Sequence, residues 1–229
     1  MRRFWKRAEA VAVEGGWGVE LDGKPLRTPG KLPLVLPREG LARAIAAEWD
    51  EAPESVNPRA MAMTGLANVA IERVAPDAPG FVAGLASYGE ADLFCYRAEG
   101  PPKLVEQQAA GWDPMLAWAR RRFDVDFAIT QGIRHVPQPA GTAARLGHAV
   151  AALDPFRLAA LSPLVTIGGS LIAALAVAEG AIDAQVGWDA VSVDERWQIE
   201  TWGDDAEAVA ALEGRRRDWM AAAGFLTLL

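Results

Sequence analysis

The sequence predicts an α+β fold that is mainly helical. A small N-terminal antiparallel β domain, either a sheet or a partial barrel, precedes a larger α-helical domain. Turn-forming pairs that favour tight hairpins occur in the first forty residues, apolar residues take helical spacing after Pro37, and the chain is mostly helical in pattern from Pro101 onward. With 51 % hydrophobic and 23 % charged residues, the chain can bury a sizeable core. We expect the β-rich domain, which includes one helix, over residues 1–58 and the helical domain over residues 59–229.

The β domain is predicted from two hairpin signals. Gly15-Gly16 and Asp22-Gly23 each favour a two-residue turn between antiparallel strands. Prolines recur through this part of the chain, which keeps its strands short or places them at sheet edges. The strands that we expect are Ala8–Val13, Trp17–Leu21, Lys24–Arg27 and Leu32–Leu36.

The helix expected within residues 1–58 is amphipathic, because Leu41, Ile45 and Trp49 fall on one helix face. Further helices are expected over 66–74 and 77–88, followed by a short extended piece over 93–96. Three later helix starts are predicted where a capping side chain precedes a proline. These pairs are Asp113-Pro114, Asp154-Pro155 and Ser162-Pro163. The segment 125–139 lacks helical periodicity and is expected to be a long loop or short strands.

The last third of the chain contains an apolar stretch and a predicted cap. Val165–Ile182 is rich in alanine and glycine, so a buried helix explains it better than a membrane span. Ser192 and Glu195 match a capping box that opens a helix ending near Trp202. Asp204 or Asp205 can cap the final helix.

Composition argues against several classes of chemistry. The net charge of −7 and the two short arginine runs do not form the basic stripe of a nucleic-acid binder. Two histidines and one cysteine show no metal-ligand spacing, and phosphate-loop and dinucleotide signatures are missing from the sequence. We therefore expect no catalytic nucleophile, metal or cofactor. Cys95 lies in an apolar run and is expected to be a buried, inert thiol.

Acidic side chains gather near the last two helices. On a helix, Glu195, Gln198 and Trp202 share one stripe, and Glu200, Asp204 and Asp205 follow closely. Such a group can form a polar network, a binding patch or an acid/base site, whereas capping and solvated charge are its structural explanations. Trp197 and Trp202 point to different sides of a helix, so one of them is expected to be exposed, as at an interface.

Several segments, read in order, resemble the family of assembly chaperones for the ATP synthase α subunit in mitochondria and α-proteobacteria. Together they cover nearly the whole chain. The segments are Phe4-Trp5-Lys6, Leu21–Pro29, Ile45–Asp50, Asp92–Arg97, Gln108 with Trp112-Asp113-Pro114, Gly169-Ser170-Leu171, Asp194–Glu200 and Trp202–Asp205.

The resemblance implies transient binding of the newly made α subunit of the F-type ATP synthase catalytic head, before the αβ hexamer forms. It also implies that function depends on an acidic residue of the late helical motif, matched by Glu195 and Glu200, and we favour Glu195. We expect a bacterial cytoplasmic protein that is monomeric when free, binds no nucleic acid and has no stable membrane insertion. The expected partner-binding residues are Glu195, Gln198, Glu200, Trp202, Asp204 and Asp205.

Two alternatives stay open. One is a small hydrolase or lyase that uses Glu195, Glu200 and Asp92 as acid and base, which would need raised carboxylate pKa values in a closed pocket. The other is a stable subunit of a larger complex, which would need an obligate partner and a large apolar surface.

Overall fold

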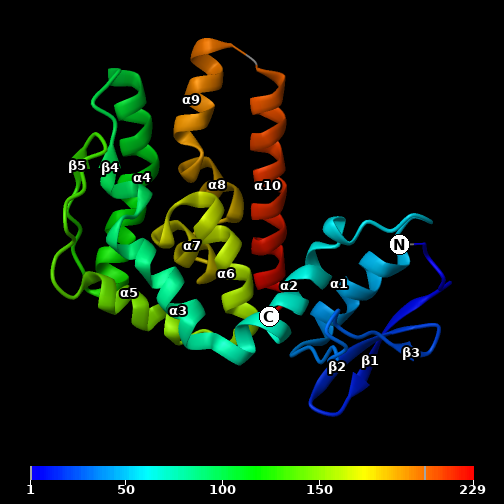
Figure 1. Cartoon of the computed structure of the whole chain (residues 1–229). Helices are drawn as coiled ribbons and strands as arrows, with labels where there is room; N and C mark the ends of the chain where they lie inside the picture. Colours follow the sequence, from blue (N-terminus) through cyan, green and yellow to red (C-terminus); the bar gives the residue numbers. More distant parts are fainter. Residues whose placement is uncertain (1, 204) are drawn as a thin grey trace. The chain divides into compact units, whose positions relative to one another are not determined.

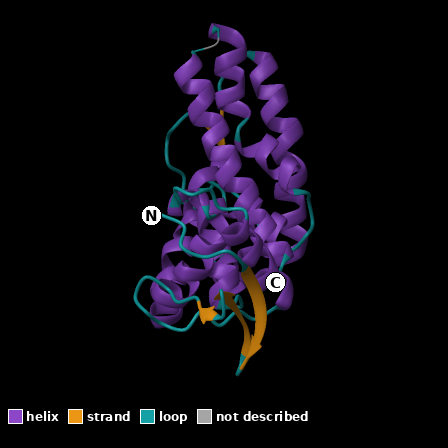
Figure 2. Cartoon of the chain, turned by 90° about the vertical axis from the view of Figure 1, so that its right-hand side faces the viewer, coloured by secondary structure: helices purple, strands orange, loops and turns teal. Residues whose placement is uncertain are grey.

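A computed structural model describes residues 2–203 and 205–229, and the chain forms two compact units (Figure 1). The first unit comprises the chain up to Ala78 together with 154–160 and 224–229, and the second comprises 79–153 and 161–223. The predicted class is confirmed, since a small N-terminal antiparallel sheet precedes a mainly helical chain (Figure 2). The division between residues 58 and 59 stays a prediction.

The sheet of the first unit has the order β1-β2-β3 and is antiparallel. Its strands are β1 (Ala8–Val13), β2 (Gly16–Leu21) and β3 (Lys24–Pro25). The first turn lies one residue earlier than predicted, at Glu14-Gly15, because Gly16 already pairs with Val13. A Cβ atom at Gly16 would lie 2.4 Å from the Leu36 carbonyl oxygen, so only glycine fits this strand position.

The predicted strands over Lys24–Arg27 and Leu32–Leu36 are largely wrong. β3 keeps two residues, and the second segment contributes isolated bridges, Arg27 to Pro33 and Trp17 to Leu36. Prolines in both segments have no amide hydrogen to donate, which limits continued pairing. Within the described residues the strands therefore form an open sheet and not a partial barrel.

Helix α1 (Glu39–Asp50) packs against this sheet. Leu41, Ile45 and Trp49 are buried in the apolar core, as the spacing predicts. The Trp49 indole donates to the Thr64 hydroxyl across 3.0 Å. The Glu48 carboxylate accepts from the backbone amides of Met63 and Thr64. These two residues lie in the first turn of α2 (Ala62–Val69). The predicted second helix continues through a π-helical turn over Ala70–Val74.

The second unit is built from helices and two short parallel strands, β4 and β5. Helices α6 and α10 contribute residues to both units. The elements after Asp77 are α3 (Ala78–Ala86), β4 (Tyr96–Arg97), α4 (Pro102–Phe123), β5 (Thr130–Gln131), α5 (Thr142–Ala151), α6 (Pro155–Gly168), α7 (Leu171–Ala178), α8 (Ala184–Val191), α9 (Val193–Trp202) and α10 (Ala206–Thr227).

Two of the three predicted proline starts are wrong. Pro114 lies inside α4 and Pro163 lies inside α6. Each proline removes one intrahelical hydrogen bond, but buried side chains on either side, such as Trp112 and Leu116, hold α4 through the interruption. The third start is correct, because the Asp154 carboxylate accepts from the amides of Phe156 and Arg157 at 2.9 and 3.0 Å.

The segment predicted to be extended over 93–96 begins instead as a 3₁₀ turn, Leu93–Cys95, before β4. The side chain of Asp92 makes this turn by accepting from the Phe94 amide. The same buried carboxylate accepts from the Ser170 hydroxyl at 2.8 Å and from the Ile172 amide at 3.0 Å. Burial raises the pKa of Asp92 to about 6, against hydrogen bonds that lower it. Asp92 thus joins this turn to the start of α7.

The apolar stretch Val165–Ile182 forms the end of α6 and all of α7, with a turn between them. A Cβ atom at Gly168 would lie 2.7 Å from the Trp219 ring, so the glycine allows the indole of α10 to pack closely. A helix with the length and apolarity of a membrane span does not occur in the part of the chain that the structure describes. Cys95 is buried as predicted, and burial raises the pKa of its thiol to about 12.

We expect Asp92→Ala to lower the free energy of unfolding by roughly 3 kcal/mol or more, because three buried donors lose their acceptor at about 1–3 kcal/mol each. Urea unfolding followed by circular dichroism measures this change. Asp218 is exposed on α10, so Asp218→Ala serves as the control and should stay within about 0.5 kcal/mol of the wild type. A loss no larger than that of the control would contradict the role assigned to Asp92.

The cost of Asp92→Ala should also depend on pH. The pKa of Asp92 rises from 3.8 to about 6 on folding, so the folded chain binds more protons between these values. Stability from the protonated carboxyl is therefore present at low pH and lost as pH rises through about 6. We expect a larger cost at about pH 5 than at about pH 7.5. Equal costs in urea unfolding at both pH values would refute this linkage.

Candidate binding surface around helix α9

Helix α9 follows α8 almost directly, and this junction is where the predicted capping box fails. Ser192 has φ −106° and ψ 14°, not the extended backbone that a capping residue adopts. Its hydroxyl instead donates to the Trp188 carbonyl oxygen across 2.7 Å. The predicted capping box of Ser192 and Glu195 is therefore wrong. The Glu195 side chain is available for another contact.

Glu195 points toward α10 and binds Arg215. The Glu195 Oε1 and Arg215 Nη1 atoms are 2.8 Å apart, and Arg215 also donates to the carbonyl of Ile167 in α6 across 2.9 Å. The two charged side chains are 35 % and 41 % exposed, so water screens part of their attraction. Glu195 therefore helps to position α9 beside α10.

Asp194 faces a different direction and joins α9 to α4. Its Oδ1 atom accepts from the Gln108 Nε2 atom at 2.7 Å, and the Gln108 Oε1 atom accepts from the Ala98 amide at 2.8 Å. Burial raises the pKa of Asp194, the Gln108 hydrogen bond lowers it, and the Glu195 charge raises it. Among the residues that the structure describes, this half-buried carboxylate is held by the Gln108 amide and by no cation.

Asp194 lines a cavity of about 470 Å³ that we call the Asp194 groove. Trp202 stands at this groove with 78 % of its surface exposed, and Ile133 is fully exposed. The ammonium of Lys103 lies 5.4 Å from the centroid of the Trp197 ring. The groove thus combines exposed apolar side chains with a partly desolvated carboxylate. Its lining residues are Leu93, Tyr96, Arg97, Ala98, Gly100, Pro101, Leu104, Gln108, Gly132, Ile133, Asp194, Trp197, Gln198 and Trp202.

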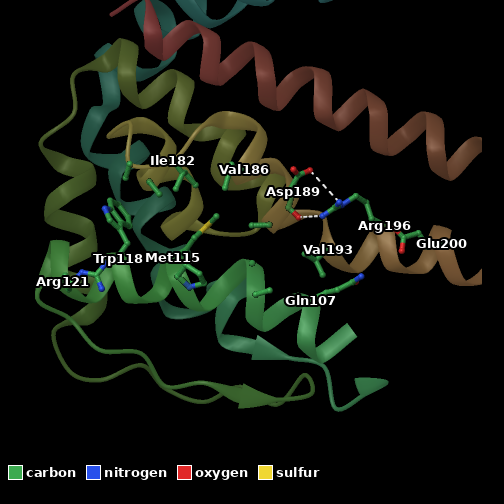
Figure 3. A pocket seen from close by; sticks show the side chains of 16 residues that line it. Gln107, Met115, Trp118, Arg121, Ile182, Val186, Asp189, Val193, Arg196 and Glu200 are labelled. Carbon is green, nitrogen blue, oxygen red and sulfur yellow. Dashed lines mark hydrogen bonds and ion pairs between the residues drawn. The ribbon is translucent and has the colours of Figure 1, made fainter. Parts of the chain in front are cut away.

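A second, larger cavity of about 680 Å³ lies against another side of α9, and we call it the Val186 groove (Figure 3). Arg196 and Glu200 border it, and Arg196 donates to the Asp189 carbonyl across 2.6 Å. Its lining residues are Gln107, Ala110, Gly111, Pro114, Met115, Trp118, Arg121, Ala176, Ala181, Ile182, Val186, Asp189, Ala190, Val193, Arg196 and Glu200.

The structure distributes the predicted site residues over separate surfaces. Gln198 and Trp202 line the Asp194 groove, Glu200 lines the Val186 groove, and Glu195 contacts α10. Asp205 precedes α10, where its carboxylate accepts from the Glu207 amide at 2.9 Å. Asp204 lies outside the described residues.

The carboxylates of the enzymatic alternative do not come together. Asp92 is enclosed by its hydrogen bonds to Ser170 and to two amides, Glu195 binds Arg215, and Glu200 borders the Val186 groove. A cluster of three or more side chains suited to a metal ion does not occur among residues 2–203 and 205–229. This region instead carries the exposed indole of Trp202 beside the half-buried carboxylate of Asp194.

Sequence reasoning missed Asp194, Trp197 and Ile133 as members of the site. Asp194 and Gln108 are 86 residues apart, so their pairing has no local pattern. Their occurrence within the segments that carry the family resemblance was the available signal.

Comparisons with known proteins agree on one family. The sequence model described as ATP12 chaperone protein matches residues 2–120. The mitochondrial protein atp12 of Schizosaccharomyces pombe is 25 % identical over 220 residues, which cover 90 % of this chain and 75 % of that protein.

Two solved structures extend this likeness to the whole chain. The crystal structure of Atp12 from Paracoccus denitrificans is 47 % identical, with 99 % of this chain and 97 % of that chain covered and a TM-score of 0.94. A protein of Agrobacterium tumefaciens is 38 % identical, with 99 % and 85 % covered and a TM-score of 0.94.

We expect Glu195→Gln to lower the free energy of unfolding by no more than about 1 kcal/mol, because the Glu195–Arg215 pair is more than one-third exposed. Urea unfolding measures the change. Arg215→Gln provides the matched partner variant, and its larger cost would reflect the lost bond to the Ile167 carbonyl. A loss well above about 2 kcal/mol for Glu195→Gln would mark Glu195 as a structural residue.

Proposed function

The chain belongs to the ATP12 chaperone family, and on this premise we propose that it binds the free α subunit of the F-type ATP synthase catalytic head. Binding shields the subunit-interface surface of the α subunit until the αβ hexamer forms. In this proposal the chain acts in the bacterial cytoplasm as a carrier, without catalysis or a cofactor. An isolated subunit exposes the apolar surface meant for its neighbours, and such surfaces aggregate unless they are covered.

The observation that carries this proposal is the exposed apolar surface beside Asp194. Trp202 is 78 % exposed and Ile133 is fully exposed, whereas the next most exposed large apolar side chains described in the second unit, Val186, Ile129 and Val209, are 40–49 % exposed. Tryptophan is one of the side chains enriched among the residues that anchor protein interfaces. The Asp194 groove therefore has the composition of a docking surface.

Asp194 makes this surface selective and its binding reversible. Its carboxylate has already lost part of its hydration, and the Gln108 amide compensates only one oxygen. A client that brings a cation or an amide donor satisfies the other oxygen, whereas a purely apolar surface leaves it unpaired. The mixed character suits a partner that is later released to its permanent neighbours.

The proposed binding residues fall into three groups. Gln198 and Trp202 face the client in the Asp194 groove together with Asp194. Glu195 supports them by holding α9 to α10 through Arg215. Glu200 and Asp205 stay in the proposed set as exposed acids at the neighbouring surfaces.

Retention of the α subunit tests the function directly. The tagged chaperone is mixed with cytoplasm from a strain blocked in β-subunit synthesis, and the retained chains are identified by mass spectrometry. Enrichment of the α subunit is expected, and its absence from the retained chains would contradict the proposal.

We expect Trp202→Ala to weaken α-subunit binding by tenfold or more, because loss of a central aromatic anchor costs roughly 2 kcal/mol. Asp194→Lys should abolish retention by placing a cation against the client. Phe4 is 71 % exposed in the first unit, so Phe4→Ala is the matched control and should bind like the wild type. Circular dichroism must show folded variants, and unchanged binding of folded Trp202→Ala would refute the assignment of the groove.

A further inference from the structure

The Val186 groove follows one face of α4. Gln107, Gly111, Met115 and Trp118 recur at intervals of three or four residues and all line it. From Gln107 to Arg121 the helix rises by about 21 Å, at 1.5 Å per residue. The groove therefore runs along about four turns of helix.

The middle of the groove is lined by small and apolar residues. Ala110, Gly111 and Ala190 present small side chains or none, and Val186 projects with 49 % of its surface exposed. Such walls allow a partner backbone to approach closely while its larger apolar side chains fill the space between α4 and α8.

The walls also restrict the backbone that can lie in the groove. They come mainly from helices α4, α7, α8 and α9, whose interior amides and carbonyls bond within their own helices. An extended segment would bury its own amides and carbonyls against these walls without partners. A helix satisfies its backbone internally, so it is the occupant that the groove accommodates. A length of about 21 Å corresponds to about fourteen helical residues.

The charged side chains at the two ends set the direction of this helix. Exposed Arg121 lies at one end and exposed Glu200 at the other, while Arg196 and Asp189 interact between them (Figure 3). A helix carries partial positive charge at its N-terminus and partial negative charge at its C-terminus. The N-terminal turn of the occupant therefore lies near Glu200 and its C-terminal turn near Arg121.

We propose that the Val186 groove holds an amphipathic helix of about fourteen residues from the same client that binds the Asp194 groove, with its N-terminus at Glu200. This inference rests on the proposed function, because it assigns a second contact to the same client. Helix α9 borders both grooves, so a client that wraps this helix contacts two of its sides. Two contacts on one client increase avidity without requiring either to be strong.

Site-specific photocrosslinking of the full chain with purified α subunit tests the proposal. A benzophenone amino acid replaces Gln107, Val186 or Trp118 in separate proteins, and mass spectrometry locates the crosslinked client peptides. All three probes should label one helical segment, with Gln107 marking its N-terminal turn and Trp118 its C-terminal turn. The exposed position Asp218 carries the control probe and should not label this segment.

A charge placed in the groove supplies the second measurement. Val186→Glu should reduce crosslinking from the Gln107 probe by about tenfold, since a carboxylate cannot be buried against apolar anchors. Val209 on α10 is exposed to a similar degree, at 40 %, and lies outside the groove, so Val209→Glu is the matched control. Both side chains retain access to water, which keeps the variants folded.

The outcomes separate this inference from the proposed function. If the α subunit is retained but the three probes label no common helix, label an extended segment or label a second copy of the chaperone, the inference is overturned and the proposed function stands. If folded Val186→Glu crosslinks like the wild type, the inference is overturned too. If the α subunit is not retained at all, both fall together.

Discussion

The buried carboxylate of Asp92 is the interaction on which the position of the binding surface depends. It joins the turn at Phe94 to the start of α7 by accepting three hydrogen bonds away from water. The Phe94 ring stacks on Trp112 of α4, with 5.4 Å between the ring centroids. The Trp112 indole in turn donates to the Ala190 carbonyl of α8 across 2.7 Å, and α8 leads directly to α9. The hydrogen bonds of Asp92 therefore position Phe94 for stacking on Trp112. Through the bond from Trp112 to α8, these contacts together position α9.

Local patterns predicted the elements whose causes are local. The spacing of Leu41, Ile45 and Trp49 predicted α1, and Asp22-Gly23 predicted a tight turn, because these signals act over a few residues. The helix starts predicted at Pro114 and Pro163 were wrong, because buried neighbours maintain each helix although the proline removes one hydrogen bond. The cap predicted at Ser192 was wrong for a related reason, since the preceding helix supplies a carbonyl that accepts from its hydroxyl.

The binding surface was only partly predictable. The angle between Trp197 and Trp202 on a helix indicated that one indole would be exposed, and Trp202 is. Glu195 and Glu200 are close in sequence, yet five residues rotate a helix by about 140°, so proximity along the chain does not bring them to one face. Asp194 depends on Gln108, which lies 86 positions away and approaches only when the second unit has folded. Contacts between residues so far apart in the chain produce no periodic pattern in a single sequence.

The exposure of Trp202 and Ile133 has a colloidal consequence. Apolar groups that suit a client also suit another copy of the same chain, so the surface favours self-association as well as function. The net charge of −7 opposes this, because copies of like sign repel over distances near the Debye length of about 8 Å at physiological salt. The concentration at which the protein stays monodisperse is then governed by its acidic composition and by the ionic strength around it.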